Sequence, residues 1–373
     1  MSMAAPGSRS GAILILGATG SFGRLLARRL ARHKDSHVIL AARRNDKLAI
    51  LAAELTATYP AALIKTVCVH APMGLADVLV SLKPAVLVDA SGPFQHQDYQ
   101  TARCCIKAGV HYIDIADSRD FVVNFATLNS AAKAAGVMAI SGASSVPGLS
   151  SAVVAHLASD DSHIDRISIS IIPGNRAPRG LSVVQAILSY VGKPIPTLVK
   201  GQWTRRIGWQ DLRRYYIKDI GWRWVSACDV PDIRLLPVIY AQLRTVEFHA
   251  GLELSFLHLG LWLLSWFVRW GLVRSLVGYA KIFQYVASWF QSWGSDQGAM
   301  IVEVEGPNIK RRWILTAEAG HGPYVPVLLA AILARQISLG QLAFLGARPC
   351  LNIVTLKSFL EEIEGLNIHC HER

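Results

Sequence analysis

The stretch Gly17-Ala18-Thr19-Gly20-Ser21-Phe22-Gly23 decides the fold of this 373-residue chain. The apolar residues 12–16 precede it and predict a buried strand. Residues 22–33 overlap its end, and their leucines form the apolar stripe of a helix. A glycine-rich turn between a strand and a helix is typical of the first unit of a doubly wound parallel sheet.

Each glycine of this turn has a mechanical reason. Gly17 permits the tight turn, Gly20 lets the backbone approach a pyrophosphate, and Gly23 lets the helix pack closely on the strand. The helix N-terminus attracts phosphates because its first N–H groups have no partner within the helix. We therefore expect a dinucleotide site made by Gly17, Ala18, Thr19, Gly20, Ser21, Phe22 and Gly23; the alternative is a turn and helix cap without a ligand.

Strands and helices alternate up to about residue 145. The expected strands cover residues 12–16, 38–42, 64–69, 86–90, 111–116 and 137–141. The expected helices cover residues 22–33, 47–58, 76–82, 99–108 and 124–135. This order predicts an α/β fold whose N-terminal part is a Rossmann-type, doubly wound parallel sheet, with ligands beyond the carboxyl ends of its strands.

The strict alternation is lost after Pro147. We expect a Rossmann domain at 1–147, an α+β substrate or dimerisation domain at 148–320, and a C-terminal helical segment at 321–373 that packs back on the first domain. The elements expected in the later part are helices at 149–158, 181–191 and 325–337 and strands at 164–172, 244–248, 299–305 and 311–317.

Two arginines at the end of the second strand indicate which cofactor is bound. An NAD-selective site usually has an acidic residue about 20 residues after the glycines, for the ribose 2'-hydroxyl. This chain has Ala41-Ala42-Arg43-Arg44 there. Because guanidinium groups bind phosphate through a planar fork, we expect Arg43 to bind the 2'-phosphate of NADP(H), with Arg44 assisting or stacking on adenine. A solvated arginine pair is the alternative.

The loop after the fourth strand contains Ser91, Gly92 and Pro93, and the glycine and proline restrict its backbone path. We expect it to contact the cofactor or the substrate; an ordinary strand-to-helix turn is the alternative.

Several motifs together resemble one known family. They are GATGSFG at 17–23, VDASGPF at 88–94, GVHYIDIADS at 109–118, SGA at 141–143 leading to Pro147-Gly148, and GARPC at 346–350. This set resembles the saccharopine dehydrogenase-like family over nearly the whole first domain. The resemblance implies an NADP-linked reductase or dehydrogenase, with a substrate or dimerisation domain inserted before the C-terminal helix. Some relatives act on imines derived from amino acids, and others resemble trans-acting enoyl reductases of lipid synthesis.

We therefore expect hydride transfer between NADP(H) and a small-molecule imine, carbonyl or enoyl substrate, hydrophobic substrates included. The rival hypothesis is a non-catalytic, NADP-binding and membrane-associated interaction protein, because a fold does not guarantee an activity.

The catalytic candidates follow the fourth and fifth strands. We expect Asp117, Ser118 and Ser91 to shape the polar end of the cleft, although an N-cap role explains an acidic residue and a serine before a helix equally well. Structural roles are expected for His111, Tyr112 and Asp114, which lie within the strand. His321 is a further candidate for a general acid, beside Tyr324, and an exposed turn is its alternative.

Other function classes lack their motifs. The net charge is +12, but no zinc-finger spacing and no RNP-like motif occurs, so no nucleic-acid partner is expected. The six cysteines lack metal-ligand spacing, which favours reduced thiols in the cytoplasm and no metal site. No nucleophile, base and acid set indicates a hydrolase. Residues 1–10 lead directly into the first strand and do not resemble a signal peptide.

An apolar segment at 252–293 needs its own explanation. Residues 254–268 carry no formal charge, but this run is shorter than the about 20 residues of a spanning helix. Trp262, Trp266 and Trp270 form one helical stripe, and Trp289 and Trp293 repeat the spacing. We expect a helix on a membrane surface, which would make the protein peripheral, or a buried lid or homodimer interface; a true span fits least well.

Overall fold

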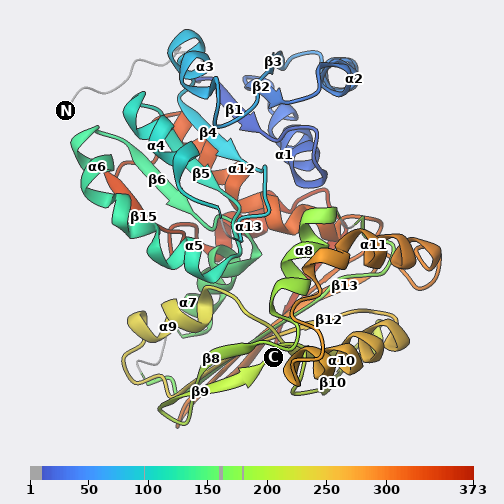
Figure 1. Cartoon of the computed structure of the whole chain (residues 1–373). Coiled ribbons are helices and arrows are strands. Elements are labelled where there is room, and N and C mark those ends of the chain that lie inside the picture. The colour runs from blue at the N-terminus through green and yellow to red at the C-terminus, as the bar shows by residue number, and fades with distance from the viewer. Residues whose placement is uncertain (1–10, 96, 159–162, 179) are drawn as a thin grey trace.

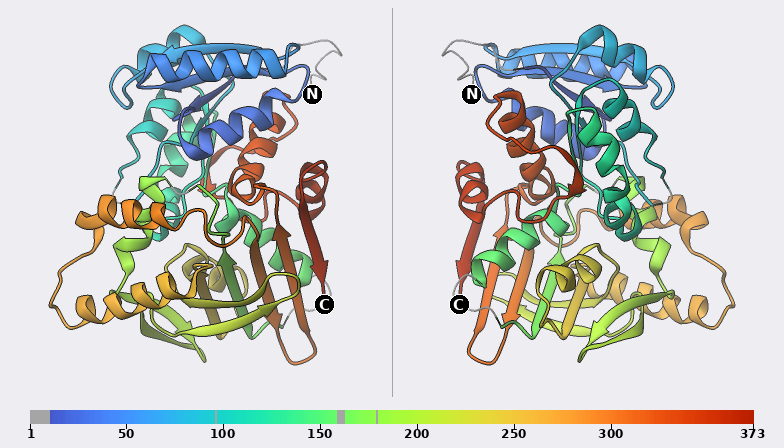
Figure 2. Two further views of the ribbon diagram at one scale, coloured as in Figure 1. Left: turned by 90° about the vertical axis from the view of Figure 1, so that its right-hand side faces the viewer. Right: turned by 90° about the vertical axis from the view of Figure 1, so that its left-hand side faces the viewer.

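The computed structural model describes residues 11–95, 97–158, 163–178 and 180–373. Within these ranges the strands form two seven-stranded sheets and a small two-stranded sheet (Figure 1). The large sheets occupy the upper and lower halves of the molecule in Figure 2. The expected α/β fold class is confirmed, while the expectation for residues 1–10 lies outside the described residues.

The first sheet is parallel throughout, with the strand order β15-β6-β5-β4-β1-β2-β3. Its strands are β1 (Ile13–Leu16), β2 (His37–Ala42), β3 (Leu63–Cys68), β4 (Val86–Asp89), β5 (His111–Asp114), β6 (Met138–Ser141) and β15 (Gly346–Pro349). The chain reverses its direction of travel across the sheet between β1 and β4, and ligands bind at such a switch point in doubly wound folds.

Burial follows from the position of each strand. All residues of β1, β4 and β6 are buried, because helices cover both faces of the central strands. The edge strand β3 is largely exposed. The covering helices are α1 (Ser21–Ala31), α2 (Asn45–Thr58), α3 (Leu75–Leu82), α4 (Gln100–Lys107), α5 (Arg119–Val123) and α6 (Asn129–Ala134).

The single helix expected at 124–135 is wrong. The structure has α5, then the 3-10 turn η1 (Asn124–Leu128), then α6. The 3-10 turn itself contains Asn124, Phe125 and Thr127, which all have low helix propensity.

The C-terminal segment contributes to both halves of the molecule. Its helix α12 (Val325–Ser338) follows η4 (Gly322–Tyr324), packs on α1 and is almost wholly buried. Strand β15 then adds a seventh strand to the first sheet, and Asn129 Oδ1 accepts a hydrogen bond from the Ala347 backbone N–H at 3.1 Å. After α13 (Leu356–Glu362), β16 (Ile368–Glu372) closes the edge of the second sheet. The sequence predicted only the helix in this segment.

The second sheet is mixed, with the order β10-β11-β12-β7-β13-β14-β16. Only β12 and β7 pair in parallel. Its strands before β16 are β7 (Arg166–Ile172), β10 (Arg213–Ile217), β11 (Gly221–Ala227), β12 (Thr245–Gly251), β13 (Gly298–Glu305) and β14 (Lys310–Ala317). The hairpin of β8 (Pro194–Val199) and β9 (Gln202–Ile207) forms the small sheet.

The second half of the molecule also contains five α-helices within the described residues. They are α7 (Ser150–Leu157), preceded by the turn η2 (Ser145–Leu149), then α8 (Leu181–Tyr190), α9 (Asp232–Ile239), α10 (Ser255–Arg269) and α11 (Ala280–Trp289), with the 3-10 turn η3 (Val277–Tyr279) before α11. The apolar segment at 252–293 thus forms two helices. No helix in the described part of the chain is both long enough and apolar enough to cross a membrane.

Candidate active site

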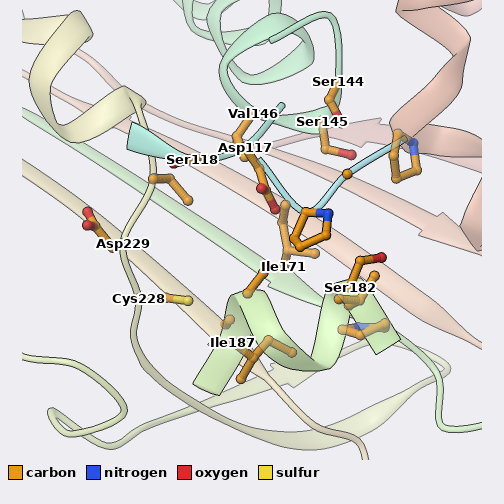
Figure 3. A pocket seen from close by; sticks show the side chains of 18 of the residues that line it. Asp117, Ser118, Ser144, Ser145, Val146, Ile171, Ser182, Ile187, Cys228 and Asp229 are labelled. Carbon is orange, nitrogen blue, oxygen red and sulfur yellow. The ribbon is translucent and has the colours of Figure 1, made fainter. Parts of the chain in front are cut away.

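A cavity of about 890 Å³ lies where the carboxyl ends of the first sheet's strands meet the second sheet. Phe22 of the glycine turn, the loop after β4 and the loop after β5 line one side. Residues of β7, α8 and the segment after β11 line the other side (Figure 3). This is the position at which a doubly wound sheet binds its ligands.

The glycine turn requires glycine at two positions. Gly17 has φ +78°, and a Cβ atom there would lie 2.9 Å from Ser91 Cα. A Cβ atom on Gly23 would lie only 2.2 Å from the carbonyl oxygen of Gly17. The turn therefore packs its own backbone against α1 and against the loop after β4, which brings the start of α1 close to the cavity.

The N-terminus of α1 fits a phosphate. Its N-cap is Gly20, no side chain caps it, and its first turn contains no acidic residue. The first backbone N–H groups of a helix have no partner within the helix, and the helix dipole favours an anion there. Ala18 and Gly23 are buried in the turn, whereas Gly20 and Ser21 are exposed. These residues suit the pyrophosphate of a dinucleotide.

The two arginines after β2 have different surroundings. Both are exposed, and Arg44 forms an ion pair with Asp46 in which Nη2 lies 2.5 Å from Oδ2. The Asp46 carboxylate raises the pKa of Arg44. Among the described residues no carboxylate forms an ion pair with Arg43. The Arg43 guanidinium is therefore available for a ligand, whereas the Arg44 guanidinium is already paired with Asp46 at the start of the next helix.

Two buried aspartates organise the loops at the cavity. Asp89 and Asp114 end β4 and β5 and are register partners. Asp114 Oδ1 accepts hydrogen bonds from the backbone N–H groups of Gly142 at 2.8 Å and Ala116 at 3.0 Å, and from the Ser141 hydroxyl at 3.0 Å. Burial raises the pKa of Asp114 to about 7 and also raises that of Asp89. Asp114 thus has the structural role that its position within the strand predicts.

The three candidate residues of the loop after β4, Ser91, Gly92 and Pro93, have two different roles. Ser91 donates to Asp89 Oδ1 twice, from its backbone N–H at 2.9 Å and from its hydroxyl at 2.5 Å. Its side chain is exposed, and Ser91 is not among the described residues that line the cavity. Gly92 and Pro93 do line it. Ser91 therefore fixes the loop, and the next two residues face the ligand space.

Asp117 and Ser118 both line the cavity, as Figure 3 shows. Asp117 Oδ1 accepts a hydrogen bond from Gln95 Nε2 at 3.2 Å. The Asp117 side chain is exposed toward the cavity, and desolvation by the surrounding protein raises its pKa. Ser118 occupies the N-cap position of α5, but its side chain makes no capping hydrogen bond. Both groups can therefore meet a substrate.

An ion pair across the cavity was not predicted from the sequence. Arg119, at the start of α5, pairs with Asp229 after β11 and donates to the carbonyl oxygen of Pro196 at 2.8 Å. Burial raises the pKa of Asp229 to about 6, although Arg119 opposes that shift. Cys228 and Tyr190 lie beside this pair and interact with each other through their side chains. No local pattern relates residues so far apart in the chain.

Two histidines considered from the sequence have structural partners. His111 Nδ1 accepts a hydrogen bond from the Met138 backbone N–H at 2.9 Å, which ties β5 to β6. His321 Nδ1 accepts from the Asn367 backbone N–H at 2.8 Å, and its ring contacts Tyr324 edge to face. Neither histidine is among the described residues that line the cavity. Within the described ranges no cluster of His, Cys, Asp and Glu could hold a metal ion.

The cavity, the phosphate-binding turn and the doubly wound sheet together define a dinucleotide-binding domain of the dehydrogenase type. Comparison with family models agrees with this class, since residues 13–140 match the model described as saccharopine dehydrogenase NADP binding domain. This match covers about a third of the chain. None of the curated proteins matches the sequence significantly.

Solved structures resemble the chain beyond that domain. Apo histidine-tagged saccharopine dehydrogenase (L-Glu forming) from Saccharomyces cerevisiae matches with a TM-score of 0.68 at 11% identity, covering 97% of this chain and 100% of that one. Amine dehydrogenase from Mycobacterium smegmatis gives a TM-score of 0.48 at 10% identity, with 91% and 95% coverage. A C. glutamicum DAP dehydrogenase gives 0.46 at 14%, with 93% and 95% coverage. At such identities the first match shows the shared fold alone.

Proposed function

We propose that this protein is an NADP(H)-dependent oxidoreductase that transfers a hydride between C4 of the nicotinamide and an imine, carbonyl or enoyl group of an apolar substrate. One observation carries the proposal. Phe22 of the glycine turn, the Gly92-Pro93 loop and Asp117 line a single cavity that is large enough for a substrate beside the nicotinamide. The family match to residues 13–140 supports the cofactor.

The bound cofactor supplies or accepts the hydride, and the residues of this chain bind the cofactor, move the proton and orient the substrate. The N-terminus of α1 holds the pyrophosphate, and Arg43 binds the 2'-phosphate, which favours NADP(H) over NAD(H). Asp117 lines the cavity, faces the reacting group and moves the proton that accompanies the hydride, and its raised pKa suits a carboxyl to proton transfer better than an ordinary one. Ser118 orients the polar end of the substrate.

The cavity wall supports an apolar substrate. Ile171, Ile187, Trp209, Phe248 and Met300 line it. Arg119 and Lys193 are the only basic side chains among the described lining residues, and Asp229 already pairs with Arg119. A substrate with several carboxylates would need more free cations than this wall offers. An apolar chain with one reactive polar group fits better.

The test has two stages on the purified full-length protein. NADPH binding is measured first by fluorescence titration, and NADPH oxidation is then followed with matched apolar and dicarboxylic ketones, imines and enoyl compounds. We expect oxidation with apolar members, and an Asp117→Asn variant that keeps NADPH affinity but loses at least about 100-fold in kcat. Asp98→Asn is the matched control, because Asp98 is exposed and outside the cavity lining.

Tight NADPH binding without oxidation of any compound would favour the rival function, a non-catalytic NADP-binding protein. No NADPH binding at all would refute both proposals. Equal rates for Asp117→Asn and the unmodified protein would refute the role of Asp117 alone.

A further inference from the structure

The helices α10 and α11 carry large apolar side chains that are exposed on the surface of the described chain. On α10 and the residue after it these are Leu263, Phe267 and Trp270, which are 55%, 39% and 65% exposed. On α11 they are Ile282, Tyr285 and Trp289, which are 60%, 64% and 60% exposed. We call these six residues the apolar face. Singly exposed apolar residues are ordinary, but a set this concentrated marks an interaction surface.

Each half of the apolar face has helical spacing. Leu263, Phe267 and Trp270 follow at i, i+4 and i+7, and Ile282, Tyr285 and Trp289 follow at i, i+3 and i+7. Each set therefore forms one stripe along its helix. Both helices and the turn that joins them lie on the same outer side of the molecule in Figure 2.

The opposite side of α10 already has its partners within the protein. His258, Leu261, Ser265 and Val268 are buried there. The Trp209 indole donates to the His258 carbonyl oxygen at 3.3 Å, and the side-chain amide of Gln210 donates to the Ser265 hydroxyl at 3.2 Å. The helix is fixed through this side, so its outward stripe cannot simply turn inward. A helix that is apolar on both sides normally has a covering partner.

The charged residues of the segment that carries the apolar face have one sign. Arg269, Arg274 and Lys281 are exposed in this segment, and the sequence contains no acidic residue between Glu253 and Asp296. The Glu253 carboxylate is only 7% exposed and accepts hydrogen bonds from Ser295 and Arg223. The nearest carboxylate along the chain therefore does not offset the exposed cations.

This charge pattern distinguishes between two occupants. A symmetric dimer through the apolar face would bring together the same basic residues of both copies, without carboxylates from this segment between them. An anionic lipid surface would instead complement them, and tryptophan and tyrosine rings are enriched at the boundary between headgroups and acyl chains. Two short helices that cannot span a membrane suit a position in its plane.

We propose that α10, η3 and α11 dock on an anionic lipid surface, with the apolar face inserted among the headgroups and Arg274 and Lys281 against the lipid phosphates. This docking does not depend on the proposed oxidoreductase function. It would also place the cavity near the lipid, because Ser275 and Val277, in the turn between the two helices, belong to the cavity wall.

Vesicle flotation of the full-length protein tests the proposal. The vesicles consist of phosphatidylcholine alone or of phosphatidylcholine with roughly one-third phosphatidylserine. We expect flotation with the anionic vesicles and little with the neutral ones. Arg274→Gln with Lys281→Gln should weaken binding to anionic vesicles about 30-fold, which corresponds to about 1 kcal/mol for each basic residue.

The apolar contribution is tested separately. Trp270→Ala with Trp289→Ala should weaken vesicle binding about 100-fold, since each change removes an inserted ring. Trp203→Ala is the matched control, because this tryptophan is 47% exposed but lies on β9, and it should leave flotation unchanged. NADPH titration of each variant shows that its first domain is folded.

Two results would overturn the proposal. One is the absence of flotation with anionic vesicles, or flotation that both double variants leave unchanged. The other is a pair of observations: the unmodified protein does not bind vesicles, and it forms a dimer in analytical ultracentrifugation that Trp270→Ala with Trp289→Ala dissociates. The second result would assign the apolar face to a contact between two copies.

Discussion

Replacing Arg43 by alanine tests the cofactor preference most directly. Arg43 follows β2, its side chain is exposed, and among the described residues no carboxylate pairs with it. Its backbone oxygen accepts a weak contact from the Cys68 thiol, which the substitution leaves in place. The variant therefore removes a guanidinium without removing a structural ion pair, and any change in affinity reports on the ligand.

The expected change in NADPH affinity follows from the exposure of the Arg43 side chain. A hydrogen bond to a charged group contributes about 1.5–3 kcal/mol, and solvent screening at an exposed site favours the lower end. We expect Arg43→Ala to raise the Kd for NADPH about tenfold, since about 1.4 kcal/mol corresponds to a factor of ten. The Kd for NADH should change little, because NADH has no 2'-phosphate.

Arg44→Ala is the matched control for this experiment. Arg44 already pairs with Asp46, so its loss should raise the Kd for NADPH by about threefold or less. Calorimetric titration of both cofactors against both variants, at low and at high salt, gives the comparison, and salt should reduce the Arg43 effect. An equal loss of affinity for NADPH and NADH in Arg43→Ala would refute the assignment of the 2'-phosphate to this residue.

Three further changes test the scaffold. Gly23→Ala places a Cβ 2.2 Å from the Gly17 oxygen, so it should lower the free energy of unfolding by about 1–3 kcal/mol in denaturant melts and weaken NADPH binding. Burial raises the pKa of Asp232 to about 7 from an ordinary 3.8, so the free energy of unfolding falls as the pH rises from about 4 to about 7. This loss amounts to about 4 kcal/mol by about pH 8, and Asp232→Asn should abolish it. An Asp232→Asn variant with the same pH dependence as the unmodified protein would contradict this prediction. Arg119→Met leaves Asp229 without its cation, and Asp229→Asn leaves the buried Arg119 guanidinium without its carboxylate, so we expect about 3 kcal/mol of destabilisation from each variant in denaturant melts.

The elements that the sequence predicted correctly are those with a strong local pattern. The strand and helix around the glycine turn could be recognised because burial on both faces requires apolar runs, and because Gly17 and Gly23 tolerate no Cβ. The strands β13 and β14 were equally clear, since they flank a Gly306-Pro307 turn. These features depend on neighbours within about ten residues.

The elements that the sequence missed depend on distant partners. The residues of β15, Gly-Ala-Arg-Pro, have no strand periodicity and become a strand because Met138 and its neighbours in β6 offer an unpaired edge. The charged and polar residues of β16 pair with β14 for the same reason. Edge strands carry little pattern of their own, so topology alone reveals them.

The cavity shows why candidate site residues were harder to place than the fold. Asp117 and Ser118 could be proposed because they follow a strand of a parallel sheet, where side chains converge on the ligand. Their counterparts, Asp229 and Tyr190, come from the second half of the chain and have no motif. Binding of the cofactor by the first domain can therefore be predicted from a short stretch of sequence, whereas the choice of substrate depends on side chains that only tertiary packing brings to the same cavity wall. We expect substrate specificity to change with substitutions at Ile171, Ile187 and Phe248, and cofactor affinity to remain unchanged by them.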